Sequence, residues 1–259
     1  YQKALEFEPK NMRILREWAS LLRSQGNYQG AIKKYQRILE IEPDNVPVLH
    51  SWASVLESEG KDTLAIEQFD KILEIEPNNT RALERWSKIL LARGDYEGAV
   101  EKYKQIAKIN PKDIHILDTW ASALLEQRKY QVAYEKYRIA LEIDSTNIRI
   151  LSSWANALKE DKKYDLAIQK YKKIIYLSTF KYDKASAYFW MASAYGLKGE
   201  IDDFYQNMEL ALQFEYPVWD QLDVAPYATF QETDRFKAII SPYKPQGIDE
   251  ELDDLLGDL

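Results

Sequence analysis

A tryptophan recurs every 34 residues along most of this chain, as Trp18, Trp52, Trp86, Trp120 and Trp154. An alanine column and an aromatic column keep the same step. They comprise Ala31, Ala65, Ala99, Ala133 and Ala167, and Tyr35, Phe69, Tyr103, Tyr137 and Tyr171. A period of this length indicates repeated units, none of which can bury its apolar face alone. We therefore expect a stack of similar units over most of the chain.

Each unit has the pattern of two helices. In the first unit Leu15, Trp18, Ala19 and Leu22 have the i, i+3, i+4, i+7 spacing of one helical face. Gly26 ends this helix, and a second apolar stripe runs from Tyr28 to Leu39. Pro43 ends the second helix, because proline cannot continue a helix interior. The later units copy this pattern, and no segment alternates with the period of a strand.

These columns resemble the tetratricopeptide repeat family, in particular its bacterial members. The small residue of the first helix, the alanine and aromatic of the second helix and the closing proline all match the family pattern. The family's early tryptophan is a leucine here (Leu15, Leu49, Leu83, Leu117, Leu151), and tryptophan stands three residues later. The resemblance implies an all-α fold, a right-handed α-solenoid of stacked antiparallel helix pairs. Both departing columns are core positions in the family, so we expect the tryptophans to be buried.

The period also predicts the organisation of the chain. Residues 1–11 have the pattern of the second helix of an earlier repeat, which predicts further sequence upstream. Six units are expected at 12–45, 46–79, 80–113, 114–147, 148–184 and 185–215. From Tyr216 the period is lost, and residues 216–245 resemble a C-terminal helical cap, with short helices at Val218–Leu222 and Asp234–Ile240. Residues 246–259 form a separate acidic tail.

Composition excludes several functions. The 259 residues include no cysteine and two histidines, which excludes thiolate metal sites and a cysteine nucleophile. We find no glycine-rich phosphate loop, no HExxH and no GxSxG, and we predict no enzymatic activity, no metal and no cofactor. The net charge of −7 argues against nucleic acid as a partner. No apolar run is long enough to span a membrane.

The resemblance implies that the first helices line a concave groove that binds a peptide or protein. First-helix residues outside the core stripe give this groove a mild positive charge, which suits an acidic partner because arginine binds carboxylates by charge-assisted forks. The alternative is an ordinary solvated helix face. The candidate residues are Arg13, Arg16, Ser20, Arg23, His50, Arg81, Arg85, Lys88, Arg149, Asn156 and Lys159.

Phe189 and Trp190 are a further candidate, an apolar binding spot near the C-terminal end of the array. The competing interpretation is burial against the C-terminal segment. Some members of the family bind a terminal carboxylate through a fixed Lys/Asn clamp over three repeats. Only Asn156 stands at an expected asparagine position, and its repeat lacks the lysine, so we do not predict that activity.

The acidic tail is the sharpest local motif. Six of the seven net negative charges lie in the last eleven residues, among which there is no basic residue. An apolar stripe on one helical face, Ile248, Leu252, Leu255, Leu256 and Leu259, suits helix-in-groove docking. LDDLLGDL resembles the leucine–aspartate motif of adaptor proteins, and a plain disordered tail stays an alternative. We hypothesise that the tail competes for the arginine-bearing groove or mediates self-association.

The sequence therefore predicts a scaffold or assembly adaptor located in the cytoplasm. Two alternatives stay open. In the first alternative the chain is the repeat region of a larger enzyme, such as a glycosyltransferase. In the second it is an RNA-processing helical-repeat protein. The full reading frame tests the first, and salt-titrated RNA binding tests the second.

Overall fold

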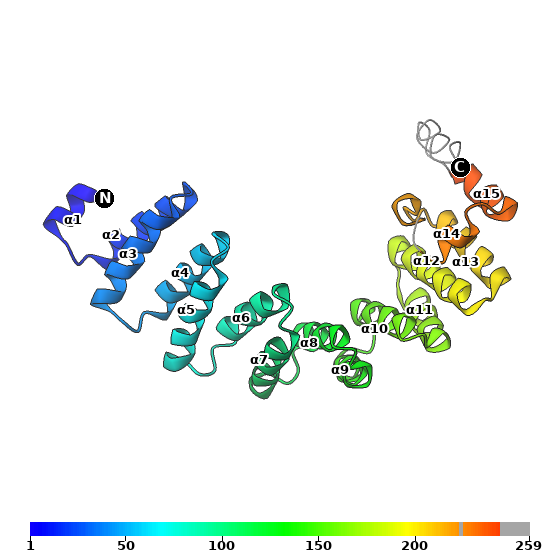
Figure 1. Ribbon diagram of the computed structural model, residues 1–259, viewed down its shortest axis with the longest axis horizontal. Helices are drawn as coiled ribbons and strands as arrows, with labels where there is room; N and C mark the ends of the chain where they lie inside the picture. Colours follow the sequence, from blue (N-terminus) through cyan, green and yellow to red (C-terminus); the bar gives the residue numbers. More distant parts are fainter. Residues whose placement is uncertain (223–224, 244–259) are drawn as a thin grey trace. The chain divides into compact units, whose positions relative to one another are not determined.

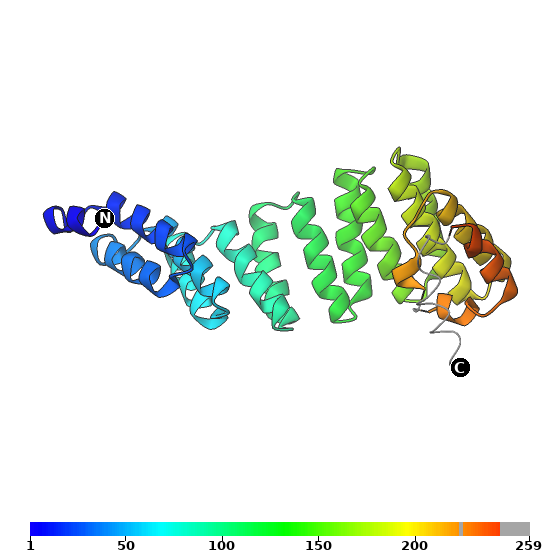
Figure 2. The same cartoon turned by 90° about the horizontal axis from the view of Figure 1, so that it is seen from above.

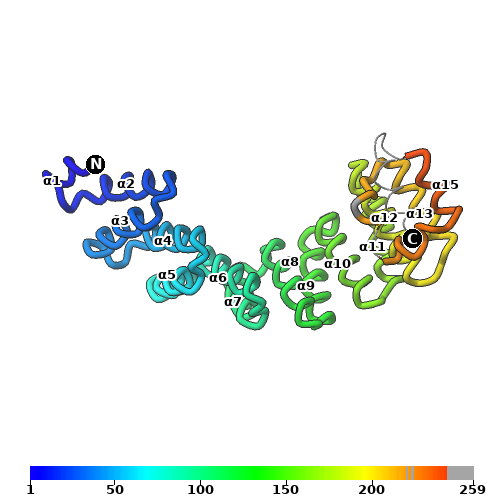
Figure 3. The backbone as a smooth tube through the Cα atoms, turned by 45° about the horizontal axis from the view of Figure 1, so that its top comes forward, coloured from blue at the N-terminus to red at the C-terminus, as the bar shows by residue number. Residues whose placement is uncertain are grey.

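The computed structural model describes residues 1–222 and 225–243, and all regular secondary structure in them is helical. The expected all-α fold of consecutive helix pairs is confirmed, and the tube in Figure 3 shows the chain reversing between the helices of a pair. The tail predicted at 246–259, with Ile248, Leu252, Leu255, Leu256 and Leu259, lies outside the described residues.

The chain divides into two compact units, Tyr1–Arg128 and Lys129–Leu259. This boundary falls inside the predicted 114–147 repeat, between its two helices (Figure 1). The first unit holds α1 (Gln2–Phe7), α2 (Met12–Ser24), α3 (Tyr28–Ile41), α4 (Val46–Ser58), α5 (Asp62–Ile75), α6 (Thr80–Ala92), α7 (Tyr96–Ile109) and α8 (Ile114–Glu126). The second holds α9 (Tyr130–Ile143), α10 (Ile148–Glu160), α11 (Tyr164–Leu177), α12 (Lys181–Lys198), α13 (Ile201–Gln213), α14 (Tyr227–Phe230) and α15 (Asp234–Ile240), with short 3₁₀ helices at Trp219–Gln221 and Ser241–Tyr243.

The first helix of each repeat is called an A helix (α2, α4, α6, α8, α10, α12) and the second a B helix (α3, α5, α7, α9, α11, α13). In the first unit every helix from α2 to α8 contacts the next one in sequence. In the second unit the same holds from α9 to α13, and α15 contacts α13. Figure 2 shows this C-terminal segment beside the α12–α13 pair. Because successive helices pack on each other within each unit, burial is distributed along the unit.

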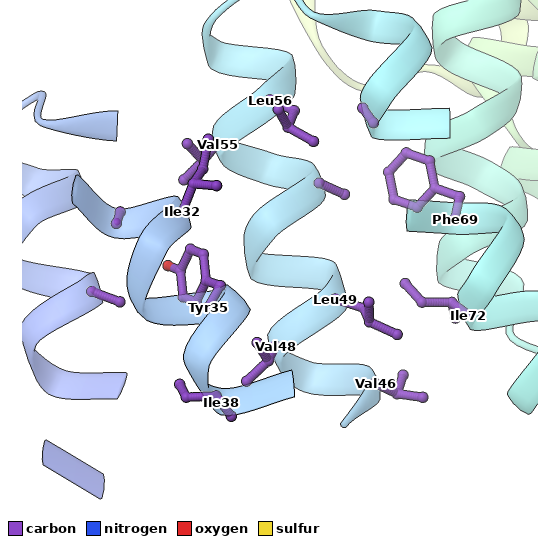
Figure 4. Close-up of a cluster of buried hydrophobic side chains, with 14 of the residues drawn as sticks. Ile32, Tyr35, Ile38, Val46, Val48, Leu49, Val55, Leu56, Phe69 and Ile72 are labelled. Carbon is purple, nitrogen blue, oxygen red and sulfur yellow. The ribbon is translucent and has the colours of Figure 1, made fainter. Parts of the chain in front are cut away.

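The A helix α4 contributes to two layers of core. In Figure 4, Val48 and Val55 of α4 point toward α3, while Leu49 points toward α5. All three side chains are at most 1% exposed. Ala31 in α3 and Ala53 in α4 are fully buried, and their small side chains permit close helix approach.

A left-handed residue ends most A helices. Gly60 follows α4 with φ +68°, and a Cβ there would contact no atom within 4 Å. Its amide donates to the Glu57 carbonyl, and the Lys61 amide donates to the Leu56 carbonyl, which is a Schellman arrangement. Lys162 has the same repeat position after α10 and adopts φ +59°, a conformation that L residues disfavour.

The tryptophan column is less buried than we expected. Trp120 is buried at 9% exposure, whereas Trp18, Trp52, Trp86 and Trp154 are half-buried. The reason is visible at Trp86, where the Lys102 ammonium of the following B helix lies 3.4 Å from the ring centroid. The indoles pack on the core with one face, and in three repeats a lysine aliphatic stem and ammonium cover another part of the ring.

The C-terminal region differs from expectation in detail. α12 begins at Lys181, four residues before the predicted start of the sixth unit. The predicted helix at Asp234–Ile240 is α15, whereas Val218–Leu222 holds only a 3₁₀ turn. α15 ends at Ile240 as expected, and a separate 3₁₀ turn follows at Ser241–Tyr243. Proline is tolerated there because the start of a helical turn needs no amide donor.

Candidate functional site

Several polar candidate residues on the A helices of the first unit are exposed. Arg16 and Arg23 project from α2, and Arg81 and Lys88 project from α6. Within the described residues none of these four has an ion-pair partner. Ser20 is also exposed, and Arg13 lies 3.9 Å from Glu17, a solvent-exposed pair that contributes little stability. These charges are available to a ligand.

Arg85 differs from these residues because α4 already supplies its counter-charge. Its guanidinium donates to the Glu57 carboxylate, and the two side chains are 22% and 24% exposed. The guanidinium carbon also lies 5.6 Å from the ring centroid of Phe69 in α5. The pair therefore joins two successive A helices, α4 and α6, and neutralises both charges at that point.

The prediction that His50 lies on the binding surface is wrong. His50 is 6% exposed, and its ring centroid lies 6.4 Å from that of Phe69. Burial lowers the pKa of His50, and the positive charge of Arg81 lowers it further. Phe69 of α5, in the same repeat, packs against this position on α4, whereas Arg16 has the same repeat position on α2 and is exposed.

Two candidate residues of α10 lie in different environments. Asn156 is half-buried, and its Oδ1 accepts a hydrogen bond of 2.6 Å from the Tyr171 hydroxyl of α11. This bond satisfies a buried phenol, so Asn156 has a structural role. Arg149 is exposed at the start of α10.

Lys159 and Trp190, which the sequence analysis treated as separate candidates, lie together. Lys159 Nζ is 4.1 Å from the ring centroid of Trp190 and donates to Ser193 Oγ at 3.4 Å. Both Lys159 and Trp190 are half-buried, and burial lowers the pKa of Lys159 to about 8. This contact joins α10 to α12, two successive A helices, in the same way as Glu57 and Arg85 join α4 to α6.

Phe189 is not part of an exposed spot. Its ring is fully buried and stacks on Tyr216 and Tyr227, at centroid distances of 4.8 and 4.4 Å. The competing interpretation, burial against the C-terminal segment, is thus confirmed for Phe189 alone. Adjacent residues on a helix face different directions, so Trp190 keeps its contact with Lys159 while Phe189 enters the core.

Sequence reasoning missed Ser193. Once the three-residue extension before α12 is counted, Ser193 has the repeat position of Lys88 and Asn156, both of which were named as candidates. The shifted register therefore carried a signal that the plain 34-residue step did not reveal. Three exposed aromatic residues around the start of α12 were also missed, Tyr176, Phe180 and Tyr182.

The described residues hold no group of three or more His, Cys, Asp and Glu side chains that is arranged to bind a metal ion. In that same part of the chain, every helix is too short or too polar to cross a bilayer.

Comparison with known families decides the class. Family models described as tetratricopeptide repeat match residues 13–45 and 52–114. These two segments of the chain are tetratricopeptide repeats. The matched segments include α2, α3, the second half of α4 and α5 to α7, and their repeat positions agree with the columns found in the sequence. Tetratricopeptide repeats build protein-interaction scaffolds, which is the general class of function supported here.

Solved structures support the same fold. A tetratricopeptide repeat protein from Parabacteroides merdae is 18% identical over 95% of this chain and 99% of its own, with a TM-score of 0.65. The C-terminal part of a tetratricopeptide repeat-containing protein from Cytophaga hutchinsonii is 16% identical over 82% of this chain and 87% of its own, with a TM-score of 0.69. YrrB, described as a tetratricopeptide repeat protein with an unusual peptide-binding site, is 13% identical over 70% and 92%, with a TM-score of 0.55. Comparison with curated proteins gives no significant match.

Proposed function

We propose that this tetratricopeptide repeat protein is a scaffold that binds an acidic polypeptide segment through the exposed faces of its A helices. One observation carries the proposal. Arg16, Arg23, Arg81 and Lys88 are exposed on α2 and α6 and have no ion-pair partner within the described chain. Arginine side chains with free donors bind carboxylates bidentately, and such bonds are stronger than neutral ones.

The proposal agrees with the family and with YrrB, whose printed description includes a peptide-binding site. The acidic C-terminal residues 246–259 have the charge and leucine content of such a segment, and we propose that they compete with a partner for the A-helix face. Deleting residues 246–259 is then expected to raise partner affinity at low salt. Unchanged affinity and unchanged oligomeric state would contradict this competition without affecting the scaffold proposal.

Site-specific photocrosslinking in the cells that make the protein tests the scaffold proposal. A photoreactive amino acid is placed at Ser20 and at Lys88, which are exposed on A helices, and at Gln36 and Lys172, which are exposed on B helices. We expect crosslinks to other proteins from the A-helix positions and few from the B-helix positions. Equal yields from both sets, or crosslinks from the B helices alone, would refute the assignment of the binding face.

A further inference from the structure

Lys159 of α10 contacts two residues of the next A helix, α12. Its ammonium lies 4.1 Å from the Trp190 ring centroid and 3.4 Å from Ser193 Oγ. A lysine ammonium has three N–H donors. Ser193 Oγ accepts one of these hydrogen bonds. The face of the Trp190 indole attracts the positive charge but offers no lone pair as a hydrogen-bond acceptor. At least one donor therefore has no strong acceptor from the described chain.

The positive charge of Lys159 has no anionic partner in its surroundings. Among the residues that the structure describes, no carboxylate lies within ion-pair distance of its Nζ. Burial lowers its pKa to about 8, and the negative charge of the adjacent Glu160 opposes this shift. A half-buried cation without a counter-ion costs free energy, and an anion supplied from outside would recover it.

The repeat register shows what is missing. Lys159 has the repeat position of Glu57, and Trp190 has the repeat position of Arg85 after allowance for the extension before α12. At α4 and α6 this position holds a complete ion pair, because Glu57 and Arg85 supply both charges. At α10 and α12 the chain supplies the cation and an aromatic ring, and no carboxylate.

Lysines over indoles elsewhere in the chain are arranged differently. Lys170 in α11 lies 3.9 Å from the ring centroid of Trp154 in α10, so this pair closes one repeat on itself. Lys170 makes no hydrogen bond to a neighbouring hydroxyl in the described chain. Of the two lysines, Lys159 is the one that also donates a hydrogen bond to a hydroxyl and that connects two A helices, the elements proposed to bind the partner.

We propose that Lys159 and Trp190 form a subsite for a side-chain carboxylate of an acidic, leucine-bearing polypeptide partner, and that the buried Ser193 hydroxyl positions the Lys159 ammonium. The inference rests on the proposed function and names the chemistry of one point on the binding face. The carboxylate accepts a hydrogen bond from Lys159 Nζ, whose position is fixed by its bond to the buried Ser193 hydroxyl, and the free part of the Trp190 ring packs against an apolar side chain of the same segment. Residues 246–259 have this composition and provide a defined probe.

The experiment titrates the full chain with a synthetic, fluorescently labelled peptide of residues 246–259 and follows anisotropy at low salt and pH 7. The test variant is Lys159→Met, which keeps an aliphatic chain over the indole and removes the charge. The matched control is Lys170→Met, which removes a B-helix lysine that lies over the ring of Trp154. We expect Lys159→Met to weaken binding about tenfold and Lys170→Met to leave it within about twofold. Lys159→Arg, which keeps the charge, is expected to restore most of the affinity.

Two further arms identify the interaction. A peptide in which Asp and Glu are replaced by Asn and Gln is expected to bind the wild-type chain and Lys159→Met equally weakly. Between pH 7 and pH 9.5 the affinity of the wild-type chain for the acidic peptide is expected to fall, because Lys159 loses its proton near pH 8 in the free protein. Lys159→Met is expected to show no such fall. Circular dichroism confirms that each variant is folded.

Several results would overturn the subsite. They are equal affinity of the wild-type chain and Lys159→Met, equal weakening by Lys159→Met and Lys170→Met, or no binding of the acidic peptide by the wild-type chain. Crosslinks from Ser20 and Lys88 in the preceding experiment would leave the scaffold function standing in each of these cases. Absence of those crosslinks together with tenfold weakening by Lys159→Met would instead confine binding to the second unit.

Discussion

Replacing Lys162 by glycine should stabilise the second unit. Lys162 follows α10 with φ +59°, and its amide donates to the Lys159 carbonyl while the Lys163 amide donates to the Leu158 carbonyl. Gly60 forms the same arrangement after α4 with φ +68°. A left-handed conformation costs an L residue about 1–2 kcal/mol, whereas glycine adopts it freely. Glycine also loses about 0.5–1 kcal/mol more conformational free energy on folding. The expected net gain is about 0.5–1 kcal/mol.

Thermal and urea unfolding followed by circular dichroism measure this gain, with hydrogen exchange of the α10 and α11 amides as a local readout. In a chain of this size a gain of 1 kcal/mol raises the melting temperature by about 2–4 °C. Lys162→Ala is the matched control, because it removes the exposed lysine side chain and keeps the strained L backbone. If Lys162→Ala stabilises the unit as much as Lys162→Gly, the effect comes from the side chain and the backbone argument is refuted.

Three other perturbations test the packing and the charges. Lys61→Asn should stabilise the protein by about 0.5–1 kcal/mol in urea unfolding, because the Lys61 side chain does not cap α5. Asn27, in the same repeat position, accepts a hydrogen bond from the Gly30 amide. Ala99→Leu should destabilise by about 1–3 kcal/mol in the same assay, since Ala99 is fully buried and has no room for added methylenes. Wild-type unfolding free energy should rise relative to Lys159→Met as pH increases from 8 to 10.5, because the folded state has released a proton that the unfolded state still binds. A flat pH difference would contradict the burial of that charge.

Periodic residues made most of the fold predictable. The 34-residue columns located the A and B helices, and the family matches at 13–45 and 52–114 agree with them. Even outside the period, Asp234–Ile240 was correct because Thr233 caps the helix locally: its hydroxyl accepts from the Phe236 amide. Such signals lie within one or two turns of sequence, so they survive without tertiary information.

Burial by non-periodic partners was not predictable. His50 shares its repeat position with exposed Arg16, and only the packing of α5 and α6 around α4 makes it buried. Phe189 is covered by Tyr216 and Tyr227, which belong to a segment with no repeat register to place them. The three-residue extension before α12 shifted the register and kept Ser193 from the candidate set. Single-residue exposure depends on neighbours distant in sequence, which a periodic pattern does not name.

The contact between successive A helices explains how one backbone supports different surface chemistry. Glu57 and Arg85 at α4 and α6 satisfy each other, so this point presents a neutral pair to a partner. Lys159 and Trp190 occupy the equivalent positions at α10 and α12, where a half-buried charge lacks its anion. The repeat determines where two side chains meet. Their identities determine whether a charge is neutralised within the protein or is available to a ligand. Lys159→Glu with Trp190→Arg would therefore recreate the closed pair, and peptide binding at this point should be lost while the fold is kept.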